Sequence, residues 1–196
     1  MERDKFASAV KNTLEKNIYY HSLALEACMG GIYDYLSANN QLGSTEPAKE
    51  DWLLAGLIHD IDYYGEFKTE HPNHTIDALR LNNLEISQVV HDIVKSHAPT
   101  LTNHPITNKA GYALFCADSL TGLITAVAFV IPSRKLADVK LSSVIKRFLK
   151  EPKFAAGTRR EEVKQCESVD GLNIPLEKFI ELCLASMQSI ASEIEL

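Results

Sequence analysis

The chain has few of the features by which many proteins reveal their function. Its four cysteines make no Cys-x-x-Cys pair, which argues against a structural zinc site, and we expect buried free thiols in a reducing compartment. Positive charge is also scarce, because 20 Lys and Arg stand against 26 Asp and Glu and give a formal charge of −6. A nucleic-acid polymer or an anionic membrane is therefore a poor candidate for its main partner.

Long apolar runs and phosphate loops are missing as well. The longest apolar run, 120–131, is interrupted by Thr and Gly and falls short of the ~20 residues that span a membrane. The charged start, Met-Glu-Arg-Asp-Lys, is followed by no apolar signal segment. No Gly-rich phosphate loop is present. These absences predict a cytoplasmic protein that has no membrane partner.

What the sequence does contain is helical periodicity. Apolar residues make up 45% of the 196 residues, enough to bury a proper core, and they recur at helical spacing with no convincing strand. We predict helices at 4–16, 18–36, 48–62, 72–81, 85–97, 110–133, 134–150, 158–167 and 176–194. The fold class is therefore all-α, with one domain over 1–196. Its motif core covers about 15–130, and C-terminal helices follow from about 134 to 196.

The most informative stretch is 53–64, which reads Leu-Leu-Ala-Gly-Leu-Ile-His-Asp-Ile-Asp-Tyr-Tyr. It predicts a buried helix that ends by carrying His59 and Asp60 into an apolar environment. An ionised carboxylate without a partner is costly there, and adjacent helix positions do not face each other. A cation seated between the two side chains satisfies both, so we interpret His59 and Asp60 as half of a metal site.

Two other helices supply candidates for the other half. His21 heads an inward apolar stripe, where a hydrogen-bonded core histidine is the alternative. Asp118 is the only charged residue among the 24 residues between Lys109 and Arg134, and a cage of hydrogen bonds is its alternative. Two imidazoles and two carboxylates suit a divalent ion such as Mn, Mg, Fe, Co or Ni.

A second ion is possible if two further histidines point inward. His71 lies just before Pro72, and His97 faces inward before Pro99 ends its helix. The alternative for His97 is a C-terminal cap that the helix dipole favours. With both as ligands, Asp60 would bridge two ions. The remaining histidines are expected at a cap or in solvent (His74), on an exposed helix face (His91) and on the surface (His104).

The ordered set His, His-Asp, Asp on an all-helical chain resembles the HD-domain metal-dependent phosphohydrolase superfamily. The segments that carry the resemblance are 21–27 (His-Ser-Leu-Ala-Leu-Glu-Ala), 57–62 (Leu-Ile-His-Asp-Ile-Asp), 70–74 (Glu-His-Pro-Asn-His) and 117–123 (Ala-Asp-Ser-Leu-Thr-Gly-Leu). Two later segments, 134–140 (Arg-Lys-Leu-Ala-Asp-Val-Lys) and 154–157 (Phe-Ala-Ala-Gly), resemble a smaller branch of stand-alone HD hydrolases. The resemblance covers about 15–165.

The resemblance implies an HD-type helical bundle and assigns roles within it. His21, His59, Asp60 and Asp118 would hold the catalytic metal, with His59 and Asp60 as its centre. In two-metal members the intervening histidines, here His71 and His97, would hold the second ion. Many members have Gly where this chain has Asp62. That carboxylate is either a base that orients water or a surface group at a helix end.

The expected function is a metal-dependent hydrolase that uses metal-activated water on phosphoester bonds of a small molecule such as a nucleotide. Two alternatives remain: an HD domain that binds a nucleotide or metal without turnover, and a di-iron HD-type oxygenase. The phosphate-binding cations vary within the family. The candidates here are Lys68, Lys109, Arg134 and Arg159, and the alternative for Arg159 is a solvated side chain in the first turn of a helix.

Overall fold

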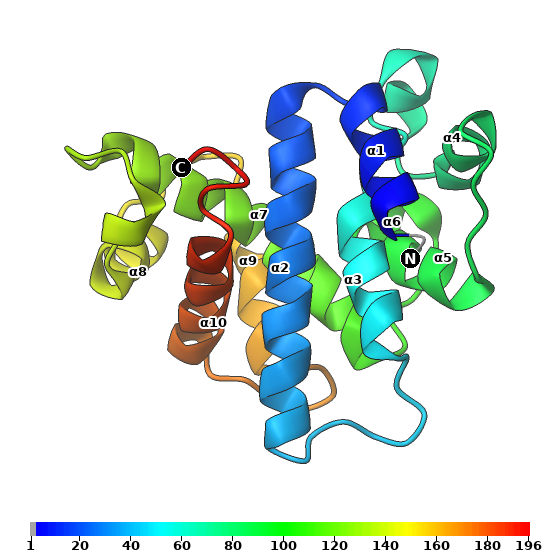
Figure 1. Ribbon diagram of the computed structural model, residues 1–196. Helices are drawn as coiled ribbons and strands as arrows, with labels where there is room; N and C mark the ends of the chain where they lie inside the picture. The colour runs from blue at the N-terminus through cyan, green and yellow to red at the C-terminus, as the bar shows by residue number, and fades with distance from the viewer. Residues whose placement is uncertain (1–2) are drawn as a thin grey trace.

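The structure is a computed structural model that describes residues 3–196, and it consists of helices joined by loops (Figure 1). The described residues contain no strand, which confirms the predicted all-α fold. The helices are α1 (Arg3–Thr13), α2 (Lys16–Ala38), α3 (Lys49–Ile58), η1 (Gly65–Glu70), α4 (Thr75–Leu81), α5 (Gln88–Lys95), α6 (Pro99–Thr102), α7 (Lys109–Val130), η2 (Leu136–Asp138), α8 (Leu141–Lys150), α9 (Arg160–Lys164), η3 (Gln165–Glu167) and α10 (Leu176–Ser189).

Two long helices organise the bundle. α2 stands upright in the centre of Figure 1 and packs against α3, α7 and α10, and its predicted inward residues Leu25, Cys28 and Ile32 are fully buried. α7 is long and apolar enough to cross a membrane, but 67% of its most apolar window is buried inside the molecule. One cluster of buried apolar side chains extends from α1 to α10. The division of the chain into domains stays a prediction.

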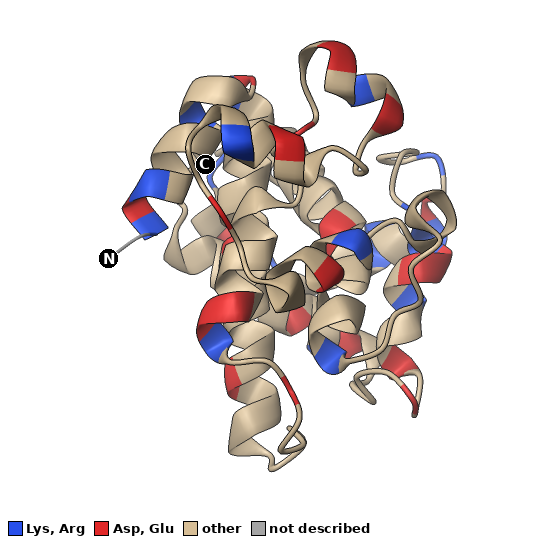
Figure 2. Cartoon of the chain, turned by 90° about the vertical axis from the view of Figure 1, so that its right-hand side faces the viewer, with Lys and Arg blue, Asp and Glu red and all other residues tan. Residues whose placement is uncertain are grey.

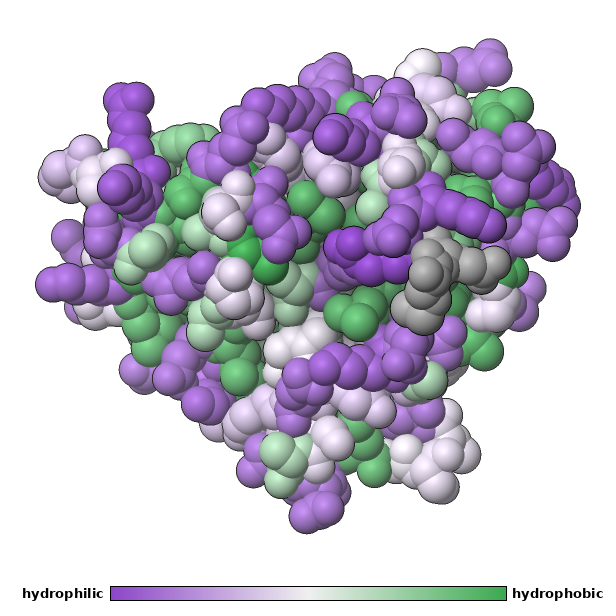
Figure 3. Space-filling model, viewed as in Figure 1, coloured by the Kyte–Doolittle hydropathy of each residue, from purple (hydrophilic) through white to green (hydrophobic). Residues whose placement is uncertain are grey.

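The surface is mixed in character. On the side of the molecule in Figure 2, Lys and Arg alternate with Asp and Glu, and no continuous basic stripe appears there. On the face in Figure 3, apolar residues form small groups between polar ones. Scattered exposed apolar residues of this kind are normal for a folded protein.

Two predicted helix boundaries next to the site were wrong. The helix expected over 48–62 ends at Ile58, so His59 and Asp60 lie in the turn that follows it. The helix expected from Pro72 begins at Thr75 instead. The physical reason is the buried carboxylate of Asp62, which accepts the backbone N–H of His74 at 2.9 Å and holds 71–74 in a turn.

The C-terminal helices also differ from the prediction. The stretch 134–150 is not one helix, because η2 and α8 are separated by extended backbone at Val139 and Lys140. The side-chain amide of Gln188 donates to the carbonyl oxygens of Leu136 and Val139, at 3.0 and 3.1 Å, and holds this break open. The last helix ends at Ser189 rather than at residue 194.

The helix expected over 158–167 begins later than predicted. α9 begins at Arg160, so Arg159 occupies the cap position and makes no side-chain capping bond. Its guanidinium pairs instead with Asp118 and Glu162. The side chain of Arg159 is thus held by ion pairs with these two carboxylates and does not cap the helix.

The four cysteines are buried free thiols, as predicted. Burial raises the pKa of Cys166 to about 12 and also raises the pKa values of Cys116 and Cys183. Because the thiolate is the reactive form, we expect the folded protein to resist 5,5′-dithiobis(2-nitrobenzoate), whereas the protein unfolded in guanidinium should react at all four thiols. Rapid labelling of any thiol under native conditions would contradict this expectation.

Candidate metal centre

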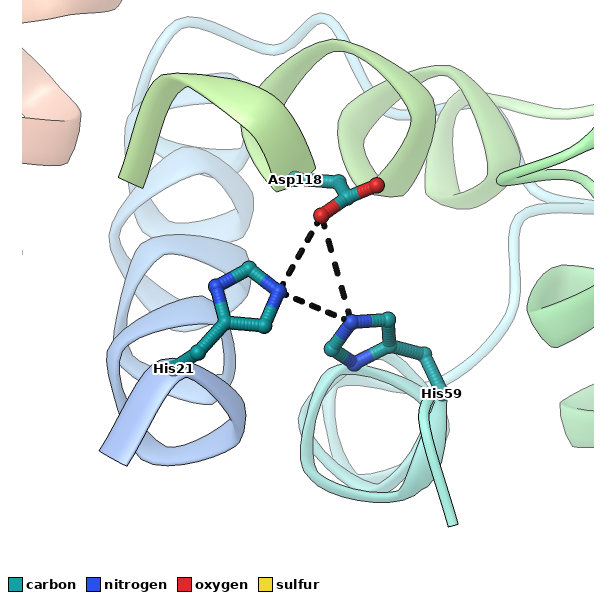
Figure 4. Close-up of side chains that lie close together, drawn as sticks. All are labelled: His21, His59 and Asp118. Carbon is teal, nitrogen blue, oxygen red and sulfur yellow. Dashed lines mark hydrogen bonds and ion pairs between the residues drawn. The ribbon is translucent and has the colours of Figure 1, made fainter. Parts of the chain in front are cut away.

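Three chain segments meet where the four predicted ligands lie. His21 comes from the second turn of α2, His59 and Asp60 follow α3 directly, and Asp118 lies midway along α7. Figure 4 shows His21, His59 and Asp118 pointing toward one another, and one ligand atom from each lies within 4.8 Å of the others. The structure thus brings the predicted four-residue set together.

The spacing of these atoms fits a single ion. The Nε2 atom of His21 lies 3.1 Å from both His59 Nε2 and Asp118 Oδ1, and His59 Nε2 lies 4.0 Å from Asp118 Oδ1. Asp60 Oδ2 lies 3.3 Å from His59 Nε2 and 3.7 Å from His21 Nε2. Ligand atoms bonded at ~2.1 Å to one octahedral ion stand about 3 to 4 Å apart. All these distances fall in or close to that range.

A second group adjoins the first through Asp60. Its Oδ1 atom lies 3.2 Å from His71 Nε2, and His71 Nε2 lies 3.1 Å from His97 Nε2. These three residues form the second group that could hold a metal ion. The two oxygens of Asp60 therefore face different groups, so this carboxylate could contribute one oxygen to an ion in each.

The opposite nitrogen of two of these imidazoles is fixed by backbone carbonyls. His59 Nδ1 lies 2.9 Å from the carbonyl oxygen of Gly56, and His97 Nδ1 contacts the carbonyl oxygen of Val94. A carbonyl oxygen only accepts, so Nδ1 carries the hydrogen in both rings. In its neutral form, each ring then turns the lone pair of Nε2 toward the centre.

Side chains hold the other two imidazoles in the same way. His71 Nδ1 donates to Asp62 Oδ1 at 2.6 Å. His21 Nδ1 lies 2.8 Å from the hydroxyl of Thr121, whose own hydrogen goes to the carbonyl oxygen of Asp118 at 2.7 Å. The Thr121 oxygen must therefore accept from His21. Partners of this kind orient metal-binding histidines in known sites.

The result is a set of convergent acceptors. In their neutral forms, the four imidazoles present Nε2 lone pairs to one another at 3.1 Å within each pair. Lone pairs at that distance repel unless a proton or a metal ion lies between them. The donor set of nitrogen and oxygen atoms, with no thiolate, suits the divalent ions named above. The residues present therefore fit a metal pair.

The electrostatics also favour positive charge in the site. Burial raises the pKa of Asp60, but the charge of His59 and hydrogen bonds to His59 and His71 together outweigh burial and hold that pKa well below its usual range. Burial lowers the pKa of His71, yet hydrogen bonds to Asp60 and Asp62 raise it to about 9. Burial and the nearby charge of His59 lower the pKa of His97 to about 4, so this ring is neutral at pH 7.

A cavity of about 490 Å³ opens onto the cluster, a size typical of sites for small molecules. Asp60, His71 and Asp118 line part of it, while Ile18 and Phe115 give it an apolar wall. The cavity can thus place the polar end of a ligand against the metal-binding groups and its organic part against apolar side chains.

Of the four candidate cations, the structure places only Arg159 in this cavity lining. Its Nη2 atom donates to Asp118 Oδ2. Arg134 is exposed on the loop after α7. Lys68 lies over the ring of Tyr63 at 4.4 Å. Lys109 donates to a backbone carbonyl oxygen 2.8 Å away.

Sequence reasoning misplaced or missed several residues around the ligands. Asp62 is fully buried, so the prediction of a surface carboxylate was wrong, and its two oxygens hold His71 and the backbone of His74. The role of Thr121 was missed, although it stands one helical turn from Asp118 on α7. His91 is half-buried rather than exposed. His74, His91 and His104 lie outside both groups that could hold a metal ion.

The contact between Thr121 and His21 gives a direct test. Thr121→Val keeps the shape of the side chain but removes the acceptor, and loss of such a partner weakens metal binding by about 10- to 100-fold. We expect the dissociation constant for Mn²⁺, measured by competition with a chelating dye, to rise by about tenfold. Thr125→Val, at a half-buried position on the same helix, is the control. Equal constants for wild type and Thr121→Val would refute this role.

A scan against known protein families gives no match for this chain, and a search of solved structures gives none either. The site is thus defined by its own geometry. The described residues form an all-α protein with two adjoining His and Asp groups that could hold metal ions.

Proposed function

We propose that the protein is a metal-dependent hydrolase that cleaves phosphoester bonds in a small molecule such as a nucleotide. The observation that carries the proposal is the position of Asp60, whose two oxygens face two separate groups of imidazoles. When bound, two divalent ions supply an activated water and counter the charge of a transferring phosphoryl group. The resemblance of the ligand pattern to HD-domain phosphohydrolases supports the same chemistry.

The chain's own residues would hold and orient the reactants. His21, His59 and Asp118 would hold one ion, His71 and His97 would hold the other, and Asp60 would contribute to both. Because each imidazole is anchored through Nδ1, the Nε2 atoms need little rearrangement when an ion enters, and such preorganisation is a large part of catalysis.

The cavity supports a small substrate. Its volume of about 490 Å³ accommodates a molecule of nucleotide size. Ile18, Phe115 and Leu101 contribute apolar surface to its lining, and Arg159 contributes a positive charge. The organic part of the substrate would lie against the first three residues, and the phosphate would lie between the metal-binding groups and Arg159.

Phosphate release from a panel of nucleotides and simple phosphate esters tests the proposal. Protein stripped with a chelator should be inactive, and Mn²⁺ or Mg²⁺ should restore turnover in wild type but not in Asp118→Asn. If metal-loaded protein cleaves no phosphoester, the proposal fails. Oxygen consumption by iron-loaded protein without phosphate release would favour the di-iron oxygenase, and stabilisation by a nucleotide without turnover would favour a binding domain.

A further inference from the structure

Arg159 is held against the metal centre at three points. Its Nη2 atom donates to Asp118 Oδ2, the carboxylate oxygen that faces away from His21. Its Nε atom donates to Glu162 Oε2, and its backbone N–H donates to Ser119 Oγ at 3.2 Å. The guanidinium is therefore fixed beside a predicted metal ligand although it is partly open to solvent.

The neighbouring Arg160 fixes the backbone that carries Arg159. Its Nε atom donates to the carbonyl oxygen of Phe148 at 3.0 Å, and its Nη2 atom donates to that of Phe154 at 2.7 Å. Further contacts of Nη2 reach the carbonyl oxygens of Arg147 and Glu151. Arg160 thus ties α9 to the end of α8 and to the loop that follows it.

Arg159 lines the cavity, which Arg160 does not, and it keeps hydrogen-bond donors free there. A guanidinium has five N–H donors, and Arg159 uses Nε and one hydrogen of Nη2 for its two carboxylate partners. Its Nη1 atom makes no hydrogen bond to any described residue. The remaining donors belong to the only Lys or Arg that lines the cavity within the described chain. A planar guanidinium of this kind is well suited to bind phosphate oxygens.

We propose that Arg159 binds an anionic oxygen of the phosphorylated ligand beside the metal pair, and that Glu162 is the positioning residue that holds its guanidinium there. This inference rests on the proposed function for the identity of the ligand. It also gives the start of α9 a role in the site. The proposed metal ligands all lie before residue 119, and the start of α9 places the guanidinium of Arg159 beside them.

The rival interpretation is that Arg159 only orients Asp118. In that case its loss would weaken metal binding, and phosphate binding at saturating metal would be unchanged. Measuring the affinities for metal and for phosphate therefore distinguishes a phosphate-binding residue from one that acts on the metal alone.

Inorganic phosphate is the probe for this proposal. Its dissociation constant is measured by calorimetry on full-length protein at saturating Mn²⁺, after the metal content of each variant has been confirmed. Arg159→Gln should weaken phosphate binding by about tenfold or more, because it removes charge-assisted hydrogen bonds. Arg159→Lys, which keeps the charge but loses the planar fork, should fall between wild type and Arg159→Gln.

Glu162→Gln should weaken phosphate binding by a few fold while Mn²⁺ binding is retained, because Arg159 keeps its charge and loses one anchor. Glu161→Gln is the matched control, since it makes the same charge change on the same helix at an exposed residue paired with Lys164. Phosphate affinity in Arg159→Gln equal to wild type would overturn the proposal even if the protein hydrolyses phosphoesters. Arg159-dependent phosphate binding without hydrolysis would overturn the proposed function alone.

Discussion

Replacing Asp60 with asparagine is expected to empty both metal-binding groups and to lower phosphoester hydrolysis by at least about 10²- to 10³-fold. One oxygen of Asp60 lies 3.3 Å from His59 Nε2 and the other lies 3.2 Å from His71 Nε2. An amide keeps the shape of the side chain, but it has no negative charge and offers a nitrogen in place of one oxygen. Either ion therefore loses a charged ligand, and the link between the two is broken.

Metal content by mass spectrometry and the rate of phosphate release measure this effect together. The melting temperature gives a third readout, because an ion that binds only the folded state stabilises it. Added Mn²⁺ should raise the melting temperature of wild type and leave that of Asp60→Asn nearly unchanged. Asp138→Asn makes the same chemical change at an exposed residue of η2 and should behave as wild type. Full metal content in Asp60→Asn would exclude a bridging role.

The second large effect is expected at His97, which should be required for the binding of one ion but not of the other. Its Nε2 atom faces His71 at 3.1 Å, whereas the first group consists of His21, His59 and Asp118 and does not include it. His97→Gln should therefore reduce the metal content from two ions to one and lower hydrolysis by about 10²-fold, the range for losing one electrostatic partner.

His21→Gln is the matching variant on the other side of Asp60. It should also leave one ion, and the pair can be told apart by electron paramagnetic resonance of Mn²⁺. Two neighbouring Mn²⁺ ions in wild type should give a coupled signal, and each variant should give the signal of an isolated ion. Because His97 is buried, circular dichroism and the melting temperature should establish that His97→Gln is folded. A folded His97→Gln that still holds two ions would show that His97 is a structural cap.

The convergence of the candidate ligands could be predicted from the sequence, because the sequence pattern places their polar or charged side chains in apolar surroundings. Asp118 is the only charged residue among the 24 residues between Lys109 and Arg134, and His21 lies on an apolar stripe. Helical periodicity then places both side chains inward. Such conflicts between local pattern and buried polarity are typical of functional sites.

The residues that support the ligands could not be found in this way. Thr121 is an ordinary helix residue whose role depends on a contact with His21, 100 positions away along the chain. The break between η2 and α8 depends on Gln188, which lies 49 residues beyond Val139. Periodicity reports on one helix at a time, so contacts between distant segments escape it.

The packing of α10 has a consequence for how the molecule can be divided. A fragment that stops at residue 133 would keep every histidine and carboxylate of the metal centre. The fragment would nevertheless lack α10, which packs against α2 and α7. Without α10, the fully buried Cys28 would be exposed to solvent. We therefore expect that the segment with the recognisable motifs does not fold on its own, because the last third of the chain completes the hydrophobic interior behind the candidate ligands.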